Sequence, residues 1–128
     1  MSAVDDALAF ARAGLERVTA HEVARLPGAL LVDIRPERDR AEGEVPGSVP
    51  VERIVLEWRL DPHGEHRLDG LTEDTLVVVL CNEGYSSSLA ARDLRALGLR
   101  RATDLVGGFR AWRAAGLPVR EGPTEAVR

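Results

Sequence analysis

The residues best suited to chemistry in this sequence are a single cysteine and the short polar segment that follows it. Cys81 comes directly after the apolar run 76–80, whose three valines are typical of a strand buried on both faces. The segment 82–88 carries a glycine and three serines and leads into a helix that ends before Gly98. A strand, a tight loop and a helix N-terminus form a cradle of backbone amides that favours a thiolate. Cys81 is therefore the predicted nucleophile.

The residues around the cysteine leave one alternative open. A lone cysteine after an apolar run is often a small core residue with no chemical role. Gly84 and the serine-rich helix start favour a reactive cysteine, because a core cysteine requires neither. Ser86, Ser87 and Ser88 are predicted to act as N-caps of the following helix.

Four motifs in the same order resemble the rhodanese (sulfurtransferase) domain. The segment 81–87, CNEGYSS, resembles the active-site loop of that family. The segment 31–35, LVDIR, resembles its first core strand, and 45–48, VPGS, resembles its Ile-Pro-Gly-Ala turn. The segment 105–112, LVGGFRAW, resembles its Gly-Gly…Trp signature. The resemblance implies a three-layer α/β/α fold with a central, mostly parallel sheet of about five strands, which agrees with the alternation of strands and helices along the chain.

The resemblance also implies a sulfurtransferase that needs no cofactor. The Cys81 thiolate takes a sulfane sulfur from a small-molecule donor, and the resulting persulfide passes it to a thiol or cyanide acceptor. The loop is expected to stabilise both anions through its backbone amides, from Asn82, Glu83, Gly84, Tyr85, Ser86 and Ser87. Glu83 is acidic, and Ser86 stands where many relatives carry an arginine. We therefore expect weak activity with thiosulfate and favour a persulfide or another thiol-derived donor.

Charged residues outside the loop are expected to support the site. In rhodanese-like domains the residues matching Asp33 and Arg35 support the active-site loop, although a structural salt bridge is the simpler interpretation. Arg53 or Arg59 is expected to bring positive charge to the mouth of the site, because the segment after the Pro-Gly turn approaches it in this family. Glu44 stands where many relatives have a histidine, which argues against any role that needs a cation there.

Two other functions are compatible with parts of the pattern. Cdc25-type phosphatases and arsenate reductases resemble rhodanese, but their longer loop ends in an arginine six positions after the cysteine, where this chain has Ser87. Without that arginine, bidentate recognition of an oxyanion is lost. A non-catalytic interaction or regulatory module remains open, because a fold does not determine a function. The loop resembles domains associated with bacterial sulfur-amino-acid metabolism, which suggests a protein partner such as cysteine dioxygenase.

The overall composition indicates one small domain. The chain has 128 residues, 45% of them hydrophobic, and a net charge of −4 with both signs interspersed. This argues against nucleic acid or an anionic membrane as a partner. The lack of a long apolar run and of a signal-peptide pattern leads us to expect a cytoplasmic protein. The single cysteine excludes an internal disulfide and a resolving cysteine within the chain.

The predicted organisation is a helical extension at 1–17, a rhodanese-like domain at 18–120 and a flexible tail at 121–128. Strands are expected at Val18 and over 29–34, 49–51, 76–80 and 100–106. The segment 37–40 is interpreted as a solvated helical face, and the helical turns after residue 52 are expected to use Ile54, Val55, Trp58 and Leu60 as their apolar side. His63 and His66 lie in a polar loop and are not expected to bind a metal.

Overall fold

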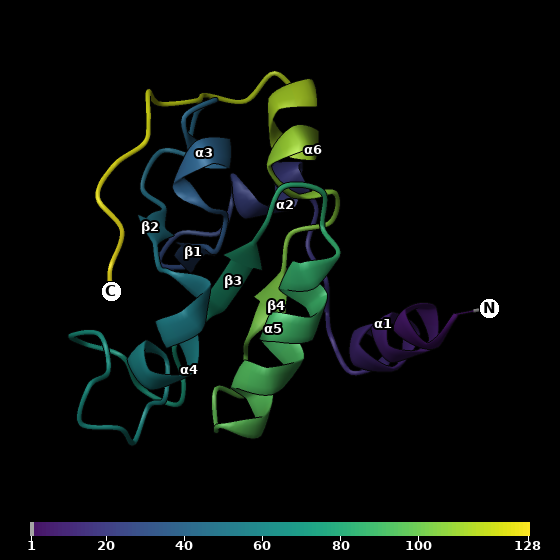
Figure 1. The fold of residues 1–128 in the computed structure, drawn as a ribbon, viewed down its shortest axis with the longest axis vertical. Helices are drawn as coiled ribbons and strands as arrows, with labels where there is room; N and C mark the ends of the chain where they lie inside the picture. The colour runs from purple at the N-terminus through teal and green to yellow at the C-terminus, as the bar shows by residue number, and fades with distance from the viewer. Residues whose placement is uncertain (1) are drawn as a thin grey trace.

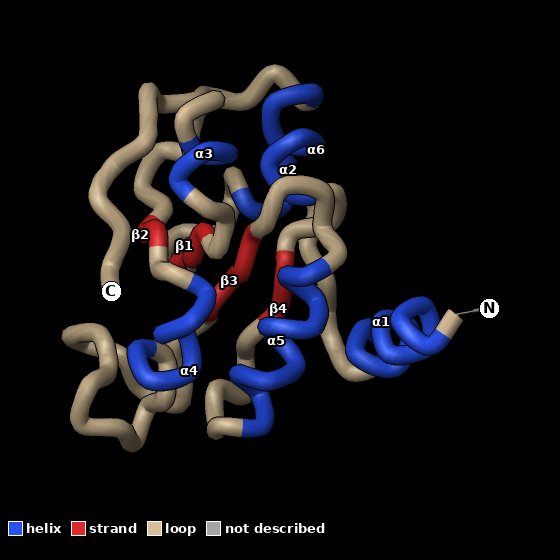
Figure 2. Tube along the Cα trace, viewed as in Figure 1, coloured by secondary structure: helices blue, strands red, loops and turns tan. Residues whose placement is uncertain are grey.

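The computed structural model describes residues 2–128 and consists of a parallel sheet with helices on both faces (Figures 1 and 2). The sheet has four strands in the order β2-β1-β3-β4, and every neighbouring pair is parallel. Within residues 2–128, none of the helices has the length and apolar character required to span a bilayer. In chain order the elements are α1 (Ala3–Ala13), α2 (Ala20–Val23), β1 (Leu30–Asp33), α3 (Glu37–Arg40), β2 (Val49–Pro50), the 3-10 helix η1 (Arg53–Val55), α4 (Leu56–Arg59), β3 (Val77–Leu80), α5 (Ser86–Ala96), β4 (Thr103–Asp104) and α6 (Gly108–Ala114).

The strand before the cysteine lies inside the sheet and is buried along its whole length, as its apolar sequence predicts. Val77 and Val79 of β3 belong to one core, which is shared with α4 and α5. Val78 and Leu80 belong to a second core, which is shared with α2 and α6. Successive side chains of a strand point to opposite faces, so this strand alone contributes to both cores. The predicted three-layer α/β/α architecture is confirmed.

The predicted number of about five strands is slightly too high. Val18 forms only an isolated parallel bridge, with Leu105 beyond β4. The next residue, Thr19, is already the N-cap of α2, where its side chain and that of Glu22 form a capping box. The chain therefore turns into a helix before a fifth strand can extend. Ser2 forms a similar capping box at the start of α1, which packs against α5.

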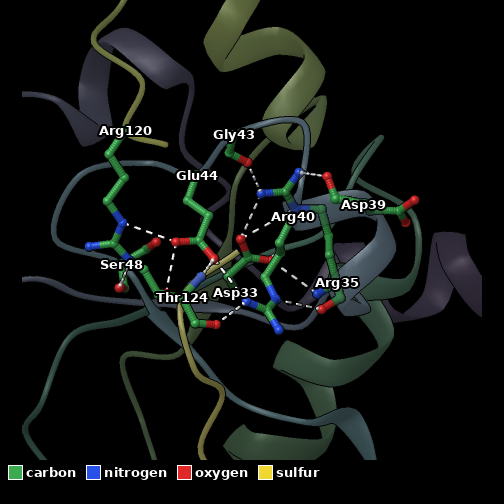
Figure 3. A network of polar contacts seen from close by, with 9 residues as sticks. All are labelled: Asp33, Arg35, Asp39, Arg40, Gly43, Glu44, Ser48, Arg120 and Thr124. Carbon is green, nitrogen blue, oxygen red and sulfur yellow. Dashed lines mark hydrogen bonds and ion pairs between the residues drawn. The ribbon is translucent and has the colours of Figure 1, made fainter. Parts of the chain in front are cut away.

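A buried network of charged side chains joins α3 to the C-terminal segment (Figure 3). The Glu44 carboxylate accepts hydrogen bonds from Arg40 Nη1 at 2.8 Å, from Arg120 Nε at 3.0 Å and from Thr124 Oγ1 at 2.8 Å. The side chains of Glu44 and Arg40 are both buried. The interpretation of residues 37–40 as a wholly solvated face is therefore wrong for Arg40, because its charge is matched by a carboxylate four residues later.

The residues after Arg120, expected from the sequence to be a flexible tail, form hydrogen bonds with the rest of the domain. The segment runs past α3 and then beside β2 in Figure 1. Val127 forms a parallel bridge with Val51, and its amide donates to the carbonyl of Pro50 at 2.9 Å. The apolar side of residues 53–60 differs from the expected one. Leu60 is buried as expected, but Leu56 is buried with it while Ile54 and Trp58 are exposed.

The Glu44 network predicts that the domain loses stability in acid. Burial raises the pKa of Glu44, but hydrogen bonds from Arg40, Thr124 and Arg120 outweigh it and lower the pKa from its ordinary value of 4.5 to about 2. A lowered native pKa stabilises the fold fully above the unfolded value and loses that contribution as the pH falls toward the native value. Urea unfolding at pH 7 should show Glu44→Gln less stable than wild type by about 3 kcal/mol, and the difference should shrink by about 2 kcal/mol at pH 3.

The exposed Glu121→Gln variant is the control for this measurement and should match wild type at both pH values. If the difference in unfolding free energy between Glu44→Gln and wild type stayed constant from pH 7 to pH 3, the lowered pKa of Glu44 would be contradicted.

Candidate active site

Cys81 lies where β3 ends and is only 7% exposed. Its side chain faces a cavity of about 300 Å³ that opens to the surface. The cavity is lined by residues that follow β1 and by the cysteine loop, namely Ile34, Arg35, Pro36, Asp39, Cys81, Asn82, Glu83, Tyr85 and Ser86. The carboxyl ends of parallel strands meet at one edge of a sheet, which is why β1 and β3 deliver their following residues to the same cavity.

The polar groups around the sulfur favour the thiolate. The Gly84 amide donates a hydrogen bond to Cys81 Sγ at 3.2 Å. Burial raises the pKa of Cys81, but hydrogen bonds from the Ser87 hydroxyl and amide, the Ser86 hydroxyl and the Gly84 amide outweigh it and hold the pKa below its ordinary value. The Ser87 hydroxyl donates its single proton to the Asp104 carboxylate at 2.8 Å. Within residues 2–128, the Gly84 amide is therefore the donor that the geometry places on the sulfur.

Helix α6 supports the loop through hydrogen bonds from its first residues. The Phe109 amide donates to the Cys81 carbonyl at 2.9 Å, and the Arg110 amide donates to the Asn82 carbonyl at 3.1 Å. A Cβ at Gly108 would lie 2.5 Å from the Cys81 carbonyl oxygen and 2.7 Å from the Asn82 carbonyl carbon. Gly108 is thus required for the close approach of two backbones as well as for its φ of +61°.

The three serines of the loop do not cap helix α5, which corrects the sequence prediction. The helix begins at Ser86, its N-cap is Tyr85, and no side chain within residues 2–128 caps it. Ser87 and Ser88 lie in the first turn, and their hydroxyls donate to the Asp104 carboxylate at 2.8 and 2.7 Å. Asp104 was missed by the sequence analysis. The available signal was its position near the end of the predicted strand 100–106, at the same sheet edge as Cys81.

Asp33 and Arg35 form a buried ion pair behind the cavity. Arg35 Nη2 donates to the Asp33 carboxylate at 2.8 Å and to the Gly43 carbonyl at 2.8 Å (Figure 3). The guanidinium also lies 4.1 Å from the centre of the Phe109 ring. Arg35 therefore links the cavity wall to α6, whereas the side-chain hydrogen bonds of Asp33, among residues 2–128, all hold Arg35.

The structure does not bring Arg53 or Arg59 to the Cys81 cavity. Arg53 pairs with Glu57 at 3.0 Å and lines a neighbouring cavity of about 750 Å³, which shares Ile34, Arg35 and Pro36 with the Cys81 cavity. Arg59 donates to the His66 carbonyl at 3.1 Å and to the Arg128 carbonyl, so it fixes the C-terminal segment.

The remaining loop side chains face the surface or the cavity. Glu83 is exposed, and its carboxylate lies 3.6 Å from Arg110 Nε. Tyr85 is 59% exposed, and the Arg12 guanidinium lies 5.6 Å from the centre of its ring. Asn82 Oδ1 is buried without a hydrogen-bond partner in the described part of the chain. Across residues 2–128, no group of three or more His, Cys, Asp or Glu side chains is placed to hold a metal ion.

A buried cysteine at the end of an inner parallel strand, with a short amide-lined loop leading into a helix, defines a class of α/β domains with a candidate cysteine nucleophile. The comparison with protein families identifies the family within this class. A model of the rhodanese-like domain matches residues 18–115, and the chain belongs to this family.

Curated relatives carry sulfurtransferase names. A sulfurtransferase of Allochromatium vinosum is 32% identical over 100 residues, which cover 78% of this chain and 86% of the relative. The thiosulfate sulfurtransferase GlpE of Ectopseudomonas mendocina is 37% identical over 93 residues, which cover 70% of this chain and 75% of the relative. Other relatives are much longer, since the chain spans about a fifth of the length of the adenylyltransferase and sulfurtransferase proteins of Zea mays that it matches.

A solved structure is similar over nearly the whole chain. It is a protein of unknown function from Rhodopseudomonas palustris, described as a possible tyrosine phosphatase, with a TM-score of 0.81 and 31% identity. The match covers 93% of this chain and 95% of that one. The similarity therefore extends beyond residues 18–115.

The packing of Gly108 under the loop gives a prediction with a matched control. Gly28 has a φ of +81°, comparable to the +61° of Gly108, but a Cβ there would meet nothing within 4 Å. Gly28→Ala should therefore cost only about 1 kcal/mol of backbone strain. Gly108→Ala should destabilise by at least about 2 kcal/mol more, because backbone atoms of the loop must shift, and should slow alkylation of Cys81.

Urea unfolding and the rate of iodoacetamide labelling measure these two effects. Equal losses of stability in the two variants, with unchanged labelling, would show that the loop does not depend on the contact with Gly108.

Proposed function

We propose that this chain is a sulfurtransferase that moves a sulfane sulfur through a persulfide on Cys81. The observation that carries the proposal is the environment of the sulfur, in which the Gly84 amide donates to Sγ and the pKa of Cys81 is lowered. A thiolate is the nucleophilic form of cysteine, and fixed amide dipoles stabilise it without having to reorganise. The sulfurtransferase names of relatives support the same reaction class.

In the first half-reaction the Cys81 thiolate attacks the outer sulfur of the donor. A bond forms between Sγ and that sulfur while the sulfur–sulfur bond of the donor breaks, and its electron pair leaves with the donor thiolate or sulfite. In the second half-reaction an acceptor thiolate or cyanide attacks the terminal sulfur of the persulfide. The bond to Sγ breaks, its electron pair returns to Cys81, and no external oxidant or reductant is consumed.

Persulfide or other thiol-derived donors fit the cavity better than thiosulfate. The loop contributes the Glu83 carboxylate, and Arg35, a guanidinium in the cavity wall, is already bonded to Asp33 and Gly43. A doubly charged donor would therefore meet a carboxylate and amides without a free guanidinium from the loop. The neighbouring cavity of about 750 Å³ gives room for the body of a larger donor or acceptor beside the sulfur.

Phosphate ester hydrolysis is suggested by the description of the Rhodopseudomonas palustris protein but is opposed by this loop. Six positions after Cys81, where a phosphatase would present an arginine to the oxyanion, this chain has Ser87, whose hydroxyl donates to the buried carboxylate of Asp104. The loop therefore offers a phosphate dianion backbone amides but no guanidinium.

Intact-mass spectrometry tests the proposed reaction. Wild-type protein exposed to a small-molecule persulfide should gain one sulfur atom, and cyanide or a thiol should remove it, because the adduct is a persulfide. Cys81→Ser should gain none. If wild type formed no adduct with the persulfide or with thiosulfate, a non-catalytic module would become the better description.

The role of Glu83 in donor choice gives a further prediction. Glu83→Gln removes one like charge from the mouth and frees Arg110, so kcat/KM for thiosulfate should rise about three- to tenfold, as expected for an exposed charge. An alkyl persulfide, with at most one negative charge, should gain less. Glu65→Gln, in the loop beside Trp58 and His66, is the control. An equal effect of both substitutions on both donors would contradict this role of Glu83.

A further inference from the structure

Two arginines that precede the family-matched residues reach the active-site loop. Arg12 of α1 donates through Nη2 to the Gly84 carbonyl at 2.7 Å and through Nε to Ser88 Oγ at 3.1 Å. Arg17 donates through Nη2 to the same carbonyl at 3.0 Å. Two guanidinium groups from one end of the chain thus converge on one carbonyl oxygen about seventy residues later.

That carbonyl belongs to the residue whose amide holds the sulfur. Gly84 has a φ of +88°, in a region that other residues rarely adopt, and glycine leaves its two peptide groups free to rotate. Its amide must nevertheless point at Cys81 Sγ, 3.2 Å away. Fixing the carbonyl on the other side of Gly84 limits that rotation. Gly84 also lies close to Gly107, since a Cβ on Gly84 would be 2.7 Å from the Gly107 amide nitrogen.

The two arginines differ in the charge that they bring. Arg17 also donates to the Asp104 carboxylate through Nε at 2.8 Å, so its charge is largely balanced. Arg12 makes no ion pair with a carboxylate among residues 2–128, and its guanidinium faces the Gly84 carbonyl, Ser88 and the Tyr85 ring. The cysteine loop contains no arginine or lysine of its own. Arg12 therefore brings a positive charge without a carboxylate partner to the carbonyl side of Gly84.

We propose that Arg12 and Arg17 are positioning residues, which hold the Gly84 peptide so that its amide stabilises the thiolate and the persulfide of Cys81. Arg12 acts through two contacts, the Gly84 carbonyl and the Ser88 hydroxyl, and Ser88 in turn donates to Asp104. The N-terminal helix is then a working part of the site. This inference rests on the proposed function only in taking Cys81 as the reacting group.

The test measures iodoacetamide alkylation of Cys81 as a function of pH, which requires no sulfur transfer. Arg12→Ala should move the midpoint of the profile upward by about half to one pH unit, which is a three- to tenfold slower alkylation below the midpoint. Arg12→Lys keeps the charge but cannot make both contacts, so its midpoint should lie between those of Arg12→Ala and wild type. Arg25→Ala, on an exposed position after α2, should match wild type.

The other charged or titratable groups at the cavity are the same in all these variants. They are Arg35 with its partner Asp33, Asp39, Glu83 facing Arg110, and the Tyr85 hydroxyl, with Asp104 behind the serines. Urea unfolding checks that each variant is folded. Arg17→Ala serves as the second variant, although the loss of a partner for buried Asp104 is expected to lower its stability.

A sulfur-transfer assay gives the second readout. Arg12→Ala should lower kcat several-fold with little change in KM for the donor, because the Gly84 amide contacts the sulfur of Cys81 rather than the free donor. A midpoint equal to that of Arg25→Ala in both the Arg12→Ala and Arg17→Ala variants would overturn the inference. If wild type transferred no sulfur but the midpoint still shifted, the proposed function would fail while the positioning role would stand.

Discussion

The carboxylate of Asp104 is the buried group on which the active-site loop depends. Asp104 is the last residue of β4. Its carboxylate accepts hydrogen bonds from Ser87 and Ser88 of α5 and from Arg17, which precedes the sheet in the chain. A carboxylate without solvent is tolerated only when its oxygens are well bonded. The need to bond this one therefore brings a strand, a helix and the N-terminal segment to the same point. The first turn of α5, and the loop that leads into it, are held from behind by this charge.

The sequence predicted the parts of the fold that short patterns determine. The apolar run before Cys81 and the glycine that ends α5 both depend on residues within a few positions of one another. Such patterns also placed the cysteine at the end of a buried strand. The number of strands is not determined by such patterns, because Val18 pairs as a single residue and a single residue has no alternating pattern.

The rest of the site depends on residues that are far apart in the chain. Arg12 and Gly84 are separated by 72 positions, and Glu44 and Thr124 by 80. No local pattern distinguishes such arginines and glutamates from solvated ones, which is why Arg40 was assigned to a solvated face and Arg53 and Arg59 to the mouth. Serines before a helix usually cap it, so the sequence predicts that role for the serines after Cys81. In the structure, Ser87 and Ser88 instead donate to a distant acceptor, Asp104, which the sequence does not reveal.

Val18 and Val127 pair with the outer strands of the sheet, which affects how the protein behaves in a crowded solution. Val18 pairs beside β4 through the Asp104 carbonyl and the Val106 amide, and Val127 pairs beside β2 through Pro50 and Glu52. The outer strands of an open sheet otherwise present unpaired amides and carbonyls on which another chain can add a strand. Here the protein occupies those positions with its own backbone. The segments around Val18 and Val127 thus cover the sheet edges and disfavour strand addition and aggregation.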